Sequence, residues 1–415
     1  MKSRNKKIIL ALAVSFLMFP FFSSENDEEV LFRFKFNKDD KSRILSTVDE
    51  EVYIEGNLSH QAKILNRISS VVTSVCENGN GITKATFMTS ESAKLKGAAF
   101  TNYTWGEEYE SIFERTPLGK YTISDIYFMP TVRDVPLFPS EPVKKGQIWT
   151  GEGHEAHDLR RGFNASKPFK VPFVASYCWK DTEEKENGTK LYVIEARYDL
   201  YFESPAPDTS TNEYLNFPAV TMGHSYQTIW WDNDRGMIDH YSEEFKISIT
   251  SFYGTSFVFV GTAHAEVNEF QRVSSDETVM QVRESVERFG LENVEVRKGE
   301  KGLVISVENI QFKPDSSELL ESEKVKLNKI GDILKLYTND ILVTGHCAAR
   351  GTKPFQQKIS EERASAVASY LTQLGVRKSE CIFTIGKGAS MPIAPNSTED
   401  GRARNRRVEI TLMDN

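Results

Sequence analysis

Residues 341–351 read ILVTGHCAARG, a short apolar run followed by a loop that carries a histidine, a cysteine and an arginine. The run Ile341 to Thr344 predicts a buried strand, because apolar residues follow one another without a charged interruption. The segment KISEERASAVASYLTQLG, residues 358–375, predicts a helix that ends at Gly375. A polar loop between a strand and a helix is typical of a binding site, yet this loop lacks a carboxylate.

Strands and helices alternate on both sides of this stretch. Before it, residues 275–290 predict a helix capped by Ser275, residues 294–312 a hairpin and residues 317–337 an amphipathic helix. After it, residues 381–388 and 405–412 predict two strands. Such alternation indicates right-handed crossovers, with the helices packed on one face of a small sheet.

The same region carries a set of residues at characteristic spacings: Phe312, Ser316, Gly345, His346, Gly351, Ile359, Ser360, Arg363, Ala364, Val367, Leu371, Gly386, Gly388, Pro392, Asn396 and the stretch GRARNRRVEI at 401–410. In these residues it resembles the OmpA-like C-terminal domain, a family shared with the peptidoglycan-associated lipoproteins and the flagellar stator proteins. The resemblance covers about residues 304–412 and implies an α/β-sandwich.

The resemblance also implies a site. Family members that bind peptidoglycan hold the zwitterionic end of a diamino acid, with an aspartate against its ammonium and an arginine against its carboxylate. The arginine corresponds to Arg363, whose planar guanidinium suits a carboxylate. The aspartate corresponds to Ala348. A tyrosine and an asparagine of the family correspond to Phe355 and Gln356, and an acidic or amide position corresponds to Lys313.

These departures weaken the expected clamp. A charge-assisted hydrogen bond contributes about 1.5 to 3 kcal/mol, so loss of the aspartate predicts diamino-acid binding weaker by roughly one to two orders of magnitude. We interpret His346 mainly as a hydrogen-bonded scaffold residue, and only one of the adjacent arginines at 406 and 407 can reach the loop. The candidate peptidoglycan-binding residues are Arg363, Gln356, His346, Arg350 and Arg406.

Three interpretations of this loop stay open. The domain still contacts the cell wall through Arg363, Arg350 and the loop backbone, with weaker binding or altered specificity. The pocket is degenerate and the fold serves contacts with other proteins. Alternatively, Arg350, Lys313 and Arg363 form an anion site for an unrelated ligand. A purely structural role for Arg363, paired with Glu362 or Asp315, is a fourth alternative.

The region from about residue 28 to 270 is rich in strand signals. Segments such as VLFRFKF (30–36) and KLYVIEARYDLYF (190–202) alternate apolar and polar residues between turn signals. They predict a mainly antiparallel sandwich or open barrel. The proline-rich segment 132–149 suggests a crossing between two β-rich subdomains, 25–135 and 136–272, before the C-terminal domain at 275–415. An outer-membrane β-barrel is the alternative, disfavoured by charges on both faces of the strands.

The first residues have the pattern of an export signal. Lys2, Arg4, Lys6 and Lys7 precede an apolar run from Ile8 to Phe22, which is too short for a comfortable membrane span. We expect residues 1–24 to be a signal peptide, with an uncleaved anchor as the alternative. The protein is therefore expected in the periplasm, and association with the outer membrane stays open.

Composition and motifs exclude other classes of protein. The formal net charge of −8 disfavours nucleic acid as a partner. The histidines of HEAH, residues 154–157, are three apart and are expected in a loop, which does not fit a zinc protease helix. Cys347 and Cys381 are expected to be reduced, because they should lie at opposite ends of parallel strands. No catalytic motif, metal site or cofactor is predicted.

The sequence as a whole predicts an exported, non-enzymatic protein of the cell envelope. Its expected partners are peptidoglycan and other envelope proteins. The main alternative is a protein-interaction scaffold whose C-terminal domain no longer binds peptidoglycan.

Overall fold

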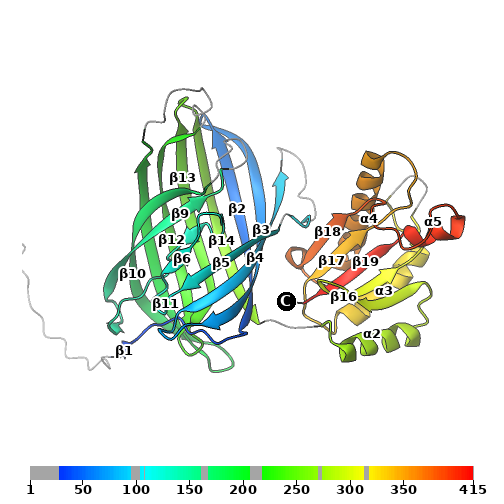
Figure 1. The fold of residues 1–415 in the computed structure, drawn as a ribbon, viewed down its shortest axis with the longest axis horizontal. Coiled ribbons are helices and arrows are strands. Elements are labelled where there is room, and N and C mark those ends of the chain that lie inside the picture. The colour runs from blue at the N-terminus through cyan, green and yellow to red at the C-terminus, as the bar shows by residue number, and fades with distance from the viewer. Residues whose placement is uncertain are drawn as a thin grey trace, which may run out of the picture.

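The structure is a computed structural model that describes residues 28–94, 103–106, 108–159, 167–205, 217–269, 273–312 and 317–414. The expected signal peptide, residues 1–24, and Lys313 lie outside the described residues. A large curled sheet and a smaller α/β domain lie side by side (Figure 1). No described helix is both long enough and apolar enough to cross a membrane.

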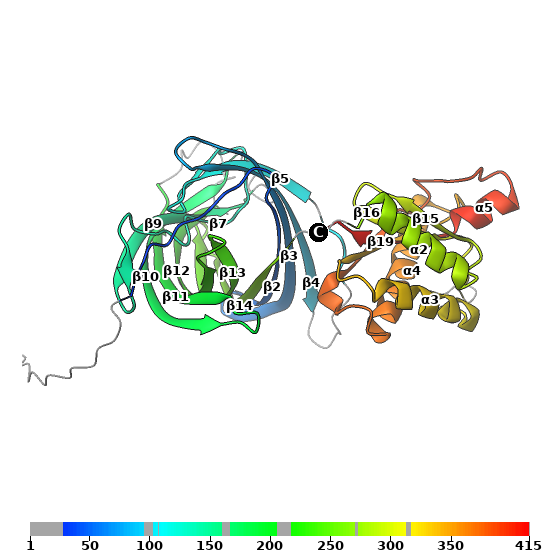
Figure 2. The same ribbon diagram turned by 90° about the horizontal axis from the view of Figure 1, so that it is seen from below.

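The large sheet has twelve strands, all of whose pairings are antiparallel. Seen from below, it curls into an incomplete barrel (Figure 2). In spatial order its strands are β6 (Tyr121–Ile123), β5 (Glu108–Arg115), β4 (Gly81–Lys94), β3 (Asn57–Val75), β2 (Lys41–Ile54), β14 (Ser256–Glu269), β13 (Met237–Ser251), β12 (Pro218–Asp232), β11 (Lys190–Glu203), β10 (Phe169–Glu184), β9 (Ile148–His157) and β7 (Val132–Arg133). A separate pair joins β1 (Glu29–Val30) to β8 (Val143–Lys144).

The predicted division of this region near residue 135 is wrong. Strand β2 from the first half pairs with β14 from the second, in a register that runs from Ile54 opposite Phe257 to Ser42 opposite Glu269. Strand β7 also pairs with β9 across the expected boundary. The proline-rich segment does not cross between domains, because it places Phe138 in the core of the sheet.

Alternation of side chains gives the sheet an apolar interior and a polar exterior. On β10, Val171, Phe173 and Tyr177 are buried in the core, whereas Lys170 and Lys180 point outward and are exposed. Strand β11 repeats the pattern, with charged residues at four of its five exposed positions and Tyr201 at the fifth. The buried aromatic residues fill the core, as expected for tryptophans in a β-rich chain: Phe32, Phe34, Phe138, Trp149, Tyr177, Trp179, Tyr192, Tyr198 and Trp231.

The C-terminal domain is the predicted α/β-sandwich. Its sheet order is β15 (Val294–Lys298), β16 (Gly302–Val307), β19 (Val408–Met413), β17 (Ile341–Gly345) and β18 (Ile382–Gly386), in which only β17 and β18 are parallel. Its helices are α2 (Asp276–Arg288), α3 (Glu321–Leu334), α4 (Lys353–Gln373), α5 (Glu399–Asn405) and the 3-10 turn η2 (Ser379–Cys381).

Apolar side chains of the helices and of one sheet face form the core of this domain. Ser275 caps α2 as predicted, accepting a hydrogen bond from the Thr278 amide at 3.1 Å. Val282 of α2, Leu327 of α3 and Val367 of α4 are fully buried in one cluster with the strands. Helix α4 begins earlier than predicted, because Thr352 caps it and a proline stands in its first turn.

The opposite face of the C-terminal sheet packs on the outside of the large sheet. Leu342, Phe383 and Met413 of the C-terminal sheet form one buried cluster with Leu65 of β3 and Met88 of β4. The segment 103–105 extends this contact along the free edge of β18. The Thr384 amide donates to the Tyr103 carbonyl at 2.9 Å, and the Trp105 amide donates to the Thr384 carbonyl at 2.8 Å. Both a face and an edge of the small sheet are therefore covered.

A buried ion cluster lies at the centre of this contact. Asp340, just before β17, is 0% exposed and pairs with the guanidinium groups of Arg43 and Arg67 on the outer face of the large sheet. The Arg67 Nε atom lies 3.1 Å from the carboxylate. Removing one partner of a buried pair leaves an uncompensated charge in a poorly solvated place.

Replacement of Asp340 by alanine should therefore destabilise the chain strongly. Two buried guanidinium groups would lose their counter-ion, so we expect Asp340→Ala to lower the free energy of unfolding by about 3 to 5 kcal/mol. The exposed Asp199, 3.7 Å from Arg197, provides a matched control. Asp199→Ala should change the free energy by less than about 1 kcal/mol. Urea unfolding followed by circular dichroism measures both, and an unchanged midpoint for Asp340→Ala would contradict the cluster.

Candidate functional site

The loop after β17 is held against helix α4 by close backbone packing. A Cβ atom on Gly345 would lie 2.0 Å from the Ser360 carbonyl oxygen, so only glycine fits at this strand end. The Cys347 amide donates to the Gly388 carbonyl at 2.9 Å, which ties the loop to the segment after β18. Gly351 ends the loop in a left-handed conformation with φ of 79°. The loop is thus fixed beside the first turns of α4.

Arg363 projects from α4 near this loop and is only partly buried. Its guanidinium carbon lies 4.9 Å from the centre of the Phe312 ring, a cation–π contact. Its buried Nε atom has no hydrogen-bond partner in the described part of the chain. Burial lowers the pKa of Arg363, and the nearby Arg406 lowers it further, while Cys347 opposes the shift.

The proposed structural pairing of Arg363 does not occur with Glu362. The Glu362 carboxylate lies 3.8 Å from the Lys358 ammonium instead. Asp315, the other suggested partner, lies outside the described residues. Within the described residues Arg363 therefore has no ion pair, which leaves its guanidinium available to an anionic group.

A second arginine lies near Arg363, and a third stands on the loop. Arg406 is close enough to repel it, and its Nη2 atom donates to Glu399 at 3.0 Å. Glu399 also pairs with Arg402 at 2.7 Å, so one carboxylate serves two guanidinium groups. Arg350 is exposed on the loop. The site is therefore cationic, which favours a carboxylate or another anion over an ammonium.

The family's aspartate position is occupied by a small apolar side chain. Ala348 is buried, and no acidic residue stands anywhere in the loop from Gly345 to Gly351. The Ala349 amide donates to the Asn396 side chain at 3.0 Å, which orders the loop without adding charge. The ammonium end of a diamino acid would find no carboxylate on this loop.

The residues at the family's tyrosine and asparagine positions have different roles. Gln356 donates from Nε2 to the Gly351 carbonyl at 3.1 Å and to the Arg350 carbonyl at 3.4 Å, so its amide braces the loop. Phe355 is 57% exposed and does not fill the site. Phe355 therefore offers an apolar surface at the edge of the loop.

His346 cannot contact a ligand directly. It is 2% exposed, and neither ring nitrogen has a hydrogen-bond partner in the described part of the chain, contrary to the expected hydrogen-bonded role. Burial lowers the pKa of His346 to about 4, with a contribution from the adjacent Arg407, so the ring is neutral at pH 7. Arg407 itself is buried and donates to Glu409 at 2.9 Å. Of the two adjacent arginines, only Arg406 lies near the site.

The HEAH histidines and the cysteines considered in the sequence occupy structural positions. The HEAH histidines lie on strand β9 and not in the expected loop. His157 contacts Glu155 at 3.0 Å, and the described residues contain no group of three side chains that could hold a metal ion. Cys381 precedes β18 and Cys347 follows β17, which places them at opposite ends of the parallel pair. All four cysteines are free.

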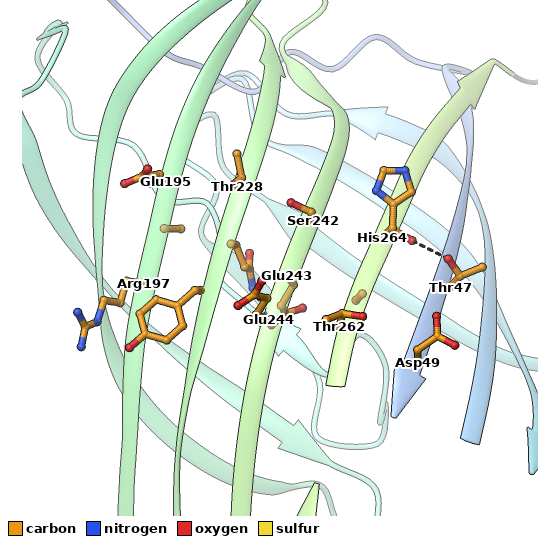
Figure 3. Close-up of a pocket in the computed structure, with 14 residues that line it drawn as sticks. Thr47, Asp49, Glu195, Arg197, Thr228, Ser242, Glu243, Glu244, Thr262 and His264 are labelled. Atoms are coloured by element: carbon orange, nitrogen blue, oxygen red, sulfur yellow. Dashed lines mark hydrogen bonds between the residues drawn. The ribbon is translucent and has the colours of Figure 1, made fainter. Parts of the chain in front are cut away.

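Two cavities lie in the large sheet, away from this loop. A hollow of about 590 Å³ extends over β11, β12, β13, β14 and β2, and its labelled residues are mostly polar (Figure 3). In this view His264 and Thr47 lie on neighbouring strands, and the Thr47 hydroxyl donates to the His264 carbonyl at 3.4 Å. A second cavity, inside the curled sheet, is about 870 Å³ and was not predicted from the sequence.

Comparison with known proteins agrees with the geometry of the C-terminal domain. The chain is 38% identical over 102 residues, 25% of its length, to outer membrane protein A of Bordetella avium, and spans 49% of that protein. It is 36% identical over 104 residues, 25% of its length, to the peptidoglycan-binding protein ArfA of Mycobacterium bovis, and spans 32% of it. The chain thus spans about half or less of the length of these curated relatives.

Solved structures are also similar to part of the chain. The peptidoglycan-associated lipoprotein from Burkholderia pseudomallei is 27% identical, covers 26% of this chain and 87% of its own, and superposes with a TM-score of 0.23. An outer membrane protein from Borrelia burgdorferi is 33% identical, with 29% and 96% coverage and a TM-score of 0.25. The match to the OmpA family spans residues 311–406, and this part of the chain is therefore a domain of the OmpA family.

Proposed function

We propose that this chain is an exported, non-enzymatic cell-envelope protein whose OmpA family domain contacts peptidoglycan with altered specificity. The observation that carries the proposal is the guanidinium of Arg363, which lies beside the site loop without an ion pair in the described part of the chain. The printed name of a relative that is 36% identical in this domain, a peptidoglycan-binding protein, supports the assignment of ligand class.

In the proposed mode of binding, the protein recognises the carboxylate of the wall peptide but not its ammonium group. Arg363 binds a carboxylate of the wall peptide, and Arg350 and Arg406 add positive charge around it. Ala348 offers nothing to an ammonium group, so the free amine of a diamino acid does not contribute. The domain therefore discriminates less between wall peptides that end in a diamino acid and those that carry only a free carboxylate.

A scaffold that no longer binds the wall is the second candidate. The observation that favours it is the cover on the C-terminal sheet, whose face and edge pack against the large sheet through Phe383 and Thr384. Through this contact the OmpA family domain and the large sheet form one unit. Such a unit can present its remaining surfaces to partner proteins. Sedimentation with purified cell wall separates the two candidates.

The polarity of the large sheet bears on the membrane-barrel alternative. A barrel in lipid presents an apolar outer band and a polar interior. Here Glu195, Arg197 and Asp199 are exposed on the outside of β11, whereas Ala196 and Tyr198 are buried inside. This order supports a β region that lies in water and associates with the membrane, if at all, by other means.

Substitution of Arg363 tests the wall-binding proposal. The full chain should sediment with purified sacculi, and Arg363→Ala should lower its affinity for them about ten- to hundredfold, because one charge-assisted hydrogen-bonding group is lost. Arg197→Ala, on the outside of the large sheet, is the matched control and should bind like the native chain. If the native chain stays in the supernatant, or if both variants bind equally, the scaffold is the better description.

Restoration of the missing acid tests the geometry of the loop. Ala348→Asp should raise affinity for a wall that contains diaminopimelate by about tenfold or more, because a carboxylate would again face the ammonium. Ala349→Asp, one residue along the same loop and exposed, is the control and should give no comparable gain. Equal affinities of Ala348→Asp and the native chain would mean that position 348 does not face the ligand.

Fractionation tests the proposed character of the β region. The chain without residues 1–27 should remain in the supernatant after ultracentrifugation in buffer without detergent, because its outward positions carry charged side chains. The same chain mixed with liposomes and floated on a density gradient is the comparison. Quantitative aggregation without detergent together with flotation would favour the membrane barrel.

A further inference from the structure

The interior of the large sheet contains a cavity of about 870 Å³. Side chains from opposite sides of the curl line it, such as Phe87 and Phe113 from β4 and β5 and Ile229 and Tyr241 from β12 and β13. Figure 2 shows the sheet curled round this interior. Folded proteins rarely leave interior voids larger than a water molecule, and small-molecule sites typically measure about 300 to 1,000 Å³. A cavity of this size is therefore a candidate ligand site.

The walls of the cavity are mainly apolar, and its mouth is polar. Aliphatic and aromatic side chains line the walls: Ile44, Ile68, Val72, Phe87, Ile229 and Val267. Exposed charged residues of both signs line one end, where β2 begins and β12 turns into β13: Lys35, Asp39, Asp40, Lys41, Asp234 and Arg235. The cavity therefore opens to solvent at this end. Its walls suit a hydrocarbon chain.

A cation on β5 lines the cavity without a counter-ion in the described part of the chain. Arg115 of β5 is stacked between two rings, with its guanidinium carbon 3.7 Å from the centre of Phe34 and 4.4 Å from that of Tyr121. Its Nε atom donates to the Gly119 carbonyl at 3.2 Å and its Nη2 atom to the Val135 carbonyl at 3.3 Å. Within the described residues it has no ion pair, and its Nη1 atom makes no hydrogen bond.

The neighbouring carboxylates are already occupied. Asp134, the acid whose charge acts on Arg115, accepts hydrogen bonds from Lys120 at 3.1 Å and from the Tyr121 amide at 2.7 Å. Glu243 also lines the cavity but accepts from Ser225 at 2.6 Å and from Gln227 at 3.2 Å. Burial raises the pKa of Glu243, which disfavours its charged form. Beside the apolar walls, away from the charged residues of both signs at the mouth, the charge left to be matched is therefore positive.

We propose that this cavity binds a single-chain amphiphile of the long-chain carboxylate type, with its carboxylate on Arg115 and its hydrocarbon chain along the apolar wall. The stacked guanidinium is held in one orientation before the ligand arrives, so little entropy is lost on binding. This function is separate from the wall contact of the C-terminal domain, because the two sites share no residue.

Equilibrium dialysis of the full chain with palmitate tests the proposal, with hexadecanol as a probe of equal chain length and no charge. Palmitate should bind saturably and more tightly than hexadecanol. Arg115→Met, which keeps the apolar stem of the side chain, should weaken palmitate binding about ten- to hundredfold and leave hexadecanol nearly unchanged. Ala85→Phe, which fills the cavity from β4, should weaken both ligands.

Lys84, the residue directly before Ala85 on β4, provides the control. Lys84 points outward toward Glu110, so Lys84→Met removes a positive charge without touching the cavity and should not alter binding of either ligand. Circular dichroism and elution volume confirm that each variant is folded. Absence of saturable palmitate binding overturns the proposal. Two other results would overturn it as well. One is equal binding of palmitate and hexadecanol that the Arg115→Met substitution does not change. The other is a folded Ala85→Phe variant that binds both ligands as tightly as the native chain.

Discussion

Strands β2, β3 and β4 line the interior cavity with one face and contact the C-terminal domain with the other. The rest of the structure depends on this constraint. Successive residues of a strand point to opposite sides, so Ile44 faces the interior cavity while Arg43 faces the C-terminal domain. A shift of one residue in the register would place the arginine in the apolar interior and lose its contact with Asp340. The buried ion cluster therefore fixes both the register of the wall and the position of the second domain.

The C-terminal domain shows how a site can keep its scaffold while its charge changes. Gly345 and Gly386 still allow the close approach of α4, and the loop is braced by Gln356 and Asn396. The charges around it are now mainly positive, because Ala348 has no carboxylate and Arg363 has no counter-ion in the described part of the chain. A binding surface of this kind selects anions, whichever molecule carries them.

The guanidinium groups of Arg363 and Arg115 follow a common physical logic. Arg363 packs on Phe312, and Arg115 packs between Phe34 and Tyr121, so each cation is stabilised by an aromatic face and makes no ion pair in the described part of the chain. Such packing keeps the free-energy cost of burying the charge modest, and it leaves N–H donors of the guanidinium free. Arg115 lines a cavity, and Arg363 lies beside the loop of the C-terminal domain.

The sequence by itself determined the C-terminal domain, because its helices and strands carry clear local signals such as the Ser275 cap and the glycines at strand ends. It also located Arg363 and the absence of acid at position 348. It did not predict α5 or the single sheet of the N-terminal region, because the pairing of β2 with β14 joins residues far apart in the chain and leaves no local signal. Only the tertiary structure decided which face of each strand is buried by the second domain, that Gln356 braces the loop, and that Arg115 faces a cavity. Each of these facts depends on distant segments brought together in space.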